Sequence, residues 1–195
     1  MEIISGRYRN FEIKLFYVCP FHMGIALAYP TLTTSECTTF NIYSVLFQLG
    51  IALYIMFNIS SFGNAIDDIW DKDIDSKIER TKNRPVASNK LSVTEAGIFT
   101  AIHLALGIHG FTLLNLNAPA ISIIAGSIAM IVIYPTFKRF TYYPAVWFGI
   151  YTSSPILVMY VNISNTFDLQ LILIYLSNFL WVVLQEAICG AQVIN

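Results

Sequence analysis

The sequence predicts an all-α membrane protein, a polytopic helix bundle of about six transmembrane helices forming a single domain over residues 1–195. Of the 195 residues, 56% are hydrophobic and only 12% are charged, and the mean hydropathy is +0.62. A soluble domain of this size is rarely so apolar. Six stretches are long enough to cross a bilayer when tilt is allowed. They are Lys14–Tyr29, Asn41–Gly63, Ala96–Asn115, Ala118–Pro135, Tyr143–Val161 and Leu169–Cys189.

The first stretch is short, close to the lower limit for a membrane span. The residues before it do not resemble a cleavable signal, because Tyr8–Ile13 is polar and no small-residue cleavage pattern follows. They also lack the Arg-rich, acid-poor composition of a transit peptide. We therefore expect no cleaved leader, which favours the endomembrane system over the mitochondrial inner membrane.

The second stretch should continue as a helix beyond its apolar part, because Ala65–Trp70 contains no helix breaker. Pro85 should end this regularity, since proline disfavours helix in the residue before it. Ser92, followed three residues later by Glu95, has the spacing of a capping box and should open the third stretch. Residues 64–95 are thus predicted to form a helix extension, a basic bend and a new helix start.

The distribution of positive charge supports the six-span count and gives the orientation. Three groups contain all eleven Lys and Arg residues: one before the first stretch, one between the second and third, and Lys138 with Arg139 between the fourth and fifth. With six spans, these groups share one side of the membrane. By the positive-inside rule that side, which includes the N-terminus and the loop at 64–95, is cytosolic.

A run of acidic residues is the strongest candidate for a functional site. Five of the twelve acidic side chains fall within residues 67–75, immediately after an apolar stretch. On a continuous helix, four of these carboxylates share one face with Asn64, whereas Asp73 points elsewhere. The four are Asp67, Asp68, Asp71 and Asp75. Such a face repels itself unless cations neutralise it, and Mg²⁺ commonly bridges carboxylates to substrate phosphates. The run therefore predicts a metal-diphosphate site at a membrane surface.

The histidines indicate helix contacts rather than chemistry. His103 and His109 lie in one apolar stretch with no carboxylate near them in sequence, and His22 lies in another. Polar groups within membrane spans usually contact neighbouring helices or serve function. We expect packing roles for all three.

Two motifs make the functional expectation specific. Residues 68–75, D-I-W-D-K-D-I-D, and 79–88, E-R-T-K-N-R-P-V-A-S, resemble the first signature of the UbiA family of intramembrane aromatic prenyltransferases. Residues 134–139, Y-P-T-F-K-R, resemble that family's Y-P-x-x-K-R motif. The wording of the first signature is most similar to 4-hydroxybenzoate polyprenyltransferases and to the polyprenyl transferases of fungal meroterpenoid pathways.

The resemblance implies transfer of a prenyl group from an allylic prenyl diphosphate to an aromatic, phenolic acceptor, with Mg²⁺ as cofactor, inside a helical bundle in the lipid bilayer. It implies metal binding at Asp67, Asp68, Asp71 and Asp75, with Asp68, Asp71 and Asp75 catalytic. It further implies that Arg84, Lys138 and Arg139 bind the diphosphate. We expect no nucleic-acid partner.

The chain departs from the family pattern in several places. Asp67 stands where the family usually has Asn, and the basic R-x-D-K-P opening is absent before Leu15. The stretch that matches the family's second motif, D-x-x-Y-x-x-x-D, retains only the carboxylate of Glu186 as a possible remnant. The family also continues through three more helices after the position of Asn195. These departures predict a truncated relative, incomplete at both ends.

Three interpretations remain open on the sequence. In the first, the chain is a short prenyltransferase. In the second, it is a catalytically degenerate or truncated relative that binds metal or lipid diphosphate without turnover. In the third, it is a non-enzymatic polytopic membrane protein whose acidic run is a solvated helix extension. Within the enzyme class, a terpene cyclase on the same scaffold is a minor alternative.

Overall fold

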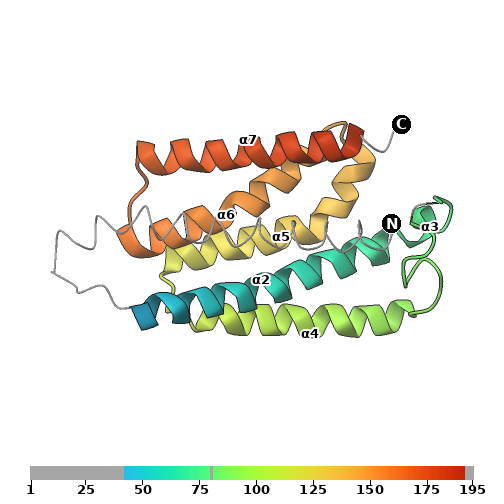
Figure 1. The fold of residues 1–195 in the computed structure, drawn as a ribbon, viewed down its shortest axis with the longest axis horizontal. Coiled ribbons are helices and arrows are strands. Elements are labelled where there is room, and N and C mark those ends of the chain that lie inside the picture. The colour runs from blue at the N-terminus through green and yellow to red at the C-terminus, as the bar shows by residue number, and fades with distance from the viewer. Residues whose placement is uncertain (1–41, 80, 192–195) are drawn as a thin grey trace. The chain divides into compact units, whose positions relative to one another are not determined.

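The described part of the chain is entirely helical. A computed structural model describes residues 42–79 and 81–191, and within these ranges it contains no strand. The helices are α2 (Ile42–Trp70), α3 (Lys72–Asp75), α4 (Val93–Thr112), α5 (Ala118–Phe140), α6 (Pro144–Ser164) and α7 (Leu169–Ala191) (Figure 1). The predicted fold class is confirmed, while the predicted first span at Lys14–Tyr29 and His22 lie outside the described residues.

Four of these helices are long and apolar enough to cross a membrane, as expected of a multi-pass membrane protein. The spans are Leu46–Trp70, Ala118–Phe137, Pro144–Ser164 and Leu169–Ile188. Helix α4, which was predicted to be a further span, forms with the expected length, but its sequence includes Glu95, His103 and His109. These polar residues lower its hydropathy, so it is not counted with the four.

The contacts divide the chain into two compact units. One contains Leu53–Leu114, which covers most of α2, all of α3 and all of α4. The other contains, among the described residues, 42–52 and 115–191, and it includes α5, α6 and α7.

Helices α2 and α4 approach each other closely within the unit at 53–114. Gly107 and Gly110 of α4 are buried there. A Cβ atom added to Gly110 would lie 2.6 Å from Cγ1 of Ile55 and 3.0 Å from Cδ1 of Tyr54. At Gly107 the same atom would lie 2.6 Å from Cδ1 of Ile59. Small residues that allow backbones to approach are typical of helix contacts in membranes.

A polar pair joins the same two helices. Nδ1 of His103 lies 2.9 Å from Oδ1 of Asn58, and because an amide oxygen only accepts, the imidazole ring donates this hydrogen bond. Nδ2 of Asn58 donates to the carbonyl of Tyr54 at 2.8 Å, so the buried amide is bonded through both of its polar atoms. The aromatic rings of Phe57 and Phe99 pack against the imidazole. The predicted helix-contact role of His103 is confirmed.

The start of α4 has the predicted capping box. Oγ of Ser92 accepts from the backbone N–H of Glu95, and the Glu95 carboxylate accepts from the backbone N–H of Ser92 at 2.8 Å. The hydrogen bonds from Ser92 lower the pKa of the Glu95 carboxyl below its usual value. The cap fixes the point at which the chain leaves the basic bend and enters α4.

In the other unit, α6 lies between α5 and α7 and contacts both (Figure 1). Ile156, Tyr160 and Val161 of α6 pack with Leu171 of α7 to form a buried hydrophobic cluster in this unit. The hydroxyl of Tyr160 also donates to Asp168, whose other oxygen accepts from the backbone N–H of Leu171 at 2.9 Å. The end of α6 is thereby joined to the start of α7.

Helix α5 continues further than predicted. The sequence suggested an end at Pro135, but the helix runs through this buried proline to Phe140. Proline removes only its own backbone donor, and spans in membranes tolerate that loss when neighbouring groups compensate. As a result, Lys138 and Arg139 belong to the last turn of α5 rather than to the loop after it.

Asn117 joins the start of α5 to the end of α6. Its side-chain oxygen accepts from the backbone N–H of Ala120 at 2.9 Å, and its Nδ2 donates to the carbonyl of Val161 at 2.9 Å. The backbone N–H of Asn117 donates to Oδ1 of Asn162 at 2.8 Å. One residue thus caps a helix and bonds the neighbouring one.

We expect Asn117→Ala to lower the free energy of unfolding by about 1 kcal/mol, the typical loss when an N-cap side chain is removed. Asn117→Asp retains the capping oxygen but lacks the Nδ2 donor, so it should cost less. The measurement is unfolding of the purified protein in detergent micelles, followed by circular dichroism. Equal stability of the alanine variant and the unmodified protein would contradict the assigned cap.

Candidate functional site

The acidic run does not lie on one continuous helix. Helix α2 ends at Trp70, and Asp71 precedes α3 with backbone angles of φ −89° and ψ 3°. The chain still makes helix-like bonds across this point, because the N–H of Asp71 donates to the carbonyl of Asp67 at 2.9 Å. The single-helix geometry predicted for the four carboxylates is therefore wrong beyond Trp70, where the chain leaves the axis of α2. Asn64, predicted to share their face, is exposed.

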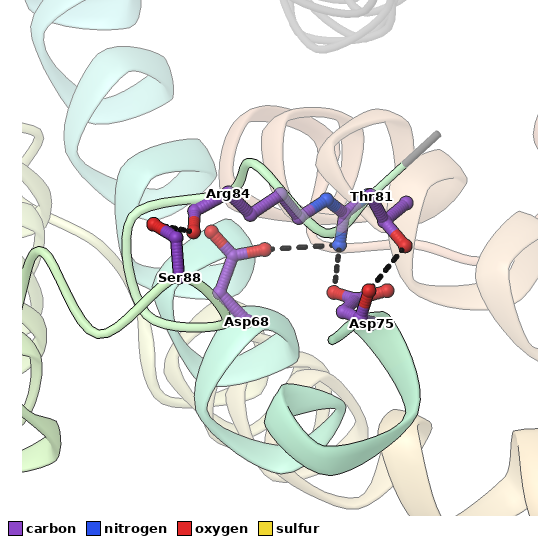
Figure 2. Close-up of polar contacts among 5 residues, drawn as sticks. All are labelled: Asp68, Asp75, Thr81, Arg84 and Ser88. Atoms are coloured by element: carbon purple, nitrogen blue, oxygen red, sulfur yellow. Dashed lines mark hydrogen bonds and ion pairs between the residues drawn. The ribbon is translucent and has the colours of Figure 1, made fainter. Parts of the chain in front are cut away.

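The arginine of the basic bend brings two of the predicted metal-binding carboxylates together. Nη1 of Arg84 donates to Oδ1 of Asp68 at 3.0 Å and to Oδ2 of Asp75 at 2.8 Å (Figure 2). Asp68 lies near the end of α2 and is half-buried, whereas Asp75 ends α3 and is only 6% exposed. Two carboxylates from two helices thus converge on one positive nitrogen.

The turn that contains Arg84 is held in place by the hydroxyl groups of Thr81 and Ser88. Oγ1 of the buried Thr81 donates to the carbonyl of Asp75 at 3.1 Å, and the N–H of Arg84 donates to the carbonyl of Thr81 at 2.9 Å. Oγ of Ser88 donates to the carbonyl of Arg84 at 2.8 Å. Figure 2 shows the two bonds donated by the Thr81 and Ser88 hydroxyl groups. The end of α3 and the basic bend are therefore held together around Arg84.

Sequence reasoning identified Arg84 but not Thr81 or Ser88 as members of this site. Both belong to the R-T-x-N-R-P-x-A-S segment, three residues before and four residues after the arginine. Their positions near Arg84 in a predicted bend could have indicated this role, because Ser and Thr hydroxyls often bond to backbone groups in turns. Val86 and Ala87 of the same segment are buried and anchor the bend.

The donor set around Arg84 suits a hard cation. Among residues 42–79 and 81–191, no three His, Cys, Asp or Glu side chains gather closely enough to hold a metal ion. The two carboxylates of Asp68 and Asp75 nevertheless already converge on a positive charge, and carboxylate oxygens are the ligands that Mg²⁺ prefers. Asp67 and Asp71 are half-buried on either side of Asp68 in the sequence. The metal-binding roles of these four carboxylates stay predictions.

The other predicted site residues belong to the unit that contains α5, α6 and α7. Arg139 is exposed in the last turn of α5, next to Lys138, and Glu186 is half-buried near the end of α7. The roles of Lys138 and Arg139 in diphosphate binding, and of Glu186 as a remnant of a second motif, stay predictions.

Comparison with known proteins gives a family match over most of the chain. The profile of the UbiA prenyltransferase family matches residues 17–186. Over 131 residues, 67% of the chain, the sequence is 35% identical to the mitochondrial 4-hydroxybenzoate polyprenyltransferase of Drosophila pseudoobscura pseudoobscura. Over 143 residues, 73% of the chain, it is 35% identical to the 4-hydroxybenzoate octaprenyltransferase of Pseudomonas aeruginosa strain LESB58. The aligned parts make up 32% and 46% of those proteins, so the chain spans less than half of either relative.

A solved structure has a similar fold. The apo structure of a UbiA homologue from Aeropyrum pernix K1 matches with a TM-score of 0.65 and 24% sequence identity. The match covers 88% of this chain and 60% of that one. This likeness supports the helical arrangement.

Proposed function

Because the chain belongs to the UbiA prenyltransferase family, we propose that it transfers a prenyl group from an allylic prenyl diphosphate to a phenolic acceptor within the membrane. The convergence of Asp68 and Asp75 on the Arg84 guanidinium supports this proposal, because binding of a metal-diphosphate requires both carboxylates and a cationic group. The names of the relatives favour 4-hydroxybenzoate or a similar phenolic acid as acceptor, as in ubiquinone-type biosynthesis. A meroterpenoid acceptor is the less supported choice.

The reaction requires stabilisation of a leaving group. As the allylic C–O bond breaks, its electron pair stays with the diphosphate, which gains negative charge in the transition state. A divalent ion such as Mg²⁺, held by Asp68, Asp71 and Asp75 with Asp67 beside them, would neutralise that charge. Arg84 would donate to diphosphate oxygens, and Lys138 and Arg139 are the further candidates for this role. Interactions that strengthen as charge develops lower the barrier rather than only improve binding.

The other reactants need an apolar environment. The prenyl tail and the allylic cation that remains must be kept away from water until the acceptor ring attacks. Apolar helices such as α2, with exposed Phe47, Phe57 and Leu53, would provide contact with lipid and with the tail. The acceptor ring forms the new C–C bond and then loses a proton to regain aromaticity.

The compartment and topology are also part of the proposal. We place the N-terminus and the acidic run on the cytosolic side of the membrane, or on its topological equivalent in a mitochondrial membrane, following the positive-inside rule. The Drosophila relative is named as mitochondrial, which supports a mitochondrial membrane rather than the endomembrane location predicted from the sequence.

A relative that binds but does not turn over is the second candidate. The stretch from Glu186 to Val193 retains one carboxylate where the family's second motif has two aspartates. With fewer carboxylate ligands from this motif, the site would hold a metal-diphosphate less firmly during bond cleavage.

The test is product formation by membranes that contain the protein, supplied with Mg²⁺, a prenyl diphosphate and 4-hydroxybenzoate. We expect a prenylated phenol and released diphosphate, both lost on addition of EDTA and restored by excess Mg²⁺. The matched control is Glu79→Gln, which removes an exposed carboxylate that is paired with Lys82 on the same loop, and it should retain activity. Saturable binding of prenyl diphosphate without product would instead support the non-catalytic relative.

A further inference from the structure

Arg84 contacts its two carboxylates in an unusual way. Arginine usually pairs with a carboxylate through two parallel N–H donors that match two oxygens of one acid. Here a single nitrogen, Nη1, donates to one oxygen of Asp68 at 3.0 Å and to one oxygen of Asp75 at 2.8 Å. One positive atom between oxygens of two different carboxylates is how a bridging metal ion would be placed.

The burial of Asp75 and Asp68 requires a positive charge between them when no metal is bound. Asp75 is almost fully buried, and a buried carboxylate without a partner costs several kcal/mol or becomes protonated. Asp68 is half-buried and adds a second negative charge to the same position. A cation must therefore lie between the two acids, and the guanidinium provides it.

The backbone of Arg84 is also held close to the two carboxylates by hydrogen bonds. Thr81 bonds to the end of α3 and Ser88 bonds to the carbonyl of Arg84, so the backbone on both sides is fixed. The long side chain above this backbone is 30% exposed, which leaves it room to move away from the carboxylates.

We propose that Arg84 is a tethered competitor of the metal: its guanidinium occupies the position between Asp68 and Asp75, and a divalent ion must displace it in order to bind. The inference rests on the proposed metal-dependent site. A displaced guanidinium has its donors available for diphosphate oxygens, so diphosphate would draw Arg84 away and favour metal binding. By linkage, metal would favour diphosphate binding to the same extent.

The first test is titration of the purified protein with Mn²⁺ alone, followed by electron paramagnetic resonance. Arg84→Gln removes the competing charge, and we expect it to bind Mn²⁺ at least about tenfold more tightly, since like charges at this range repel strongly. Arg84→Lys keeps the charge and should bind as the unmodified protein does. Lys82→Gln removes one positive charge from the same bend without touching the two carboxylates, so its affinity should be unchanged.

The second test uses the unmodified protein and so does not depend on the folding of a variant. Phenylglyoxal modifies accessible guanidinium groups, and mass spectrometry measures its attachment to the peptide that contains Arg84. We expect Mg²⁺ alone to increase modification of Arg84, because the metal releases the side chain, and to leave modification of Arg139 unchanged.

The outcomes separate this inference from the proposed function. If the unmodified protein binds Mn²⁺ and Arg84→Gln binds it equally or more weakly, the competition is refuted while the metal site stands. The competition is likewise refuted if Mg²⁺ leaves the modification of Arg84 unchanged or reduces it. If neither the unmodified protein nor any variant binds Mn²⁺, both are refuted. Competition without prenylation would refute the proposed activity alone, because neither measurement requires turnover.

Discussion

Asp75→Asn should lower the rate of prenyl transfer by roughly 10²–10³-fold, the loss typical when one group that stabilises developing charge is removed. Asp75 accepts from Arg84 at 2.8 Å and is buried, so its carboxylate is fixed in direction. The amide retains the shape of the side chain but lacks the charge that would hold a divalent ion. The measurement is the initial rate of phenol prenylation under saturating Mg²⁺ and prenyl diphosphate.

The matched control for this variant lies two residues away. Asp73→Asn removes the same charge from the same short helix, but Asp73 is exposed. Its rate should stay within about twofold of the unmodified protein, because exposed charges at a distance are screened. Equal rates for the two variants would remove Asp75 from the site. Melting curves in detergent distinguish a catalytic loss from unfolding.

Gly110→Ala should destabilise the contact between α2 and α4 by about 1–3 kcal/mol, the usual cost of forcing extra atoms into a packed interface. The added methyl group would lie 2.6 Å from Cγ1 of Ile55, an atom next to the branch point of that side chain, and 3.0 Å from the Tyr54 ring. Both neighbours belong to α2, so the added atoms press against that helix. The expected result is a lower free energy of unfolding in detergent micelles.

Gly97→Ala provides the matched control within the same helix. No described atom other than its own helix backbone and chain neighbours lies within 4 Å of a Cβ at Gly97. Alanine favours helix over glycine by about 1 kcal/mol, and both variants share that gain. The difference between the two variants therefore measures the clash alone. A Gly110→Ala protein as stable as Gly97→Ala would show that the helices are free to separate.

The sequence was sufficient to predict the helices whose signals are local. Apolar length placed α5, α6 and α7 within a few residues, and the capping box at Ser92 and Glu95 defined the start of α4. These predictions succeeded because periodicity and capping depend on residues a few positions apart.

Other features depend on residues that meet only after the chain has turned. The bridge from Asp68 to Arg84 joins positions sixteen residues apart, and the break at Asp71 has no Gly or Pro to mark it. The helical extension through Pro135 likewise depends on packing, since this proline is fully buried. Residue types identified the participants of the candidate site, whereas turn geometry determined which of them touch.

The bonds between Asn117 and α6 have a consequence for the order in which this membrane protein assembles. Asn117 precedes α5, but its partners Val161 and Asn162 are synthesised 44 and 45 residues later, at the far end of the next helix. The amino end of α5 therefore waits, without these bonds, until α6 has been synthesised and has folded back along it. The two helices should consequently enter the bilayer as a hairpin, and this closure gives the backbone N–H and the side-chain Nδ2 of Asn117 their acceptors.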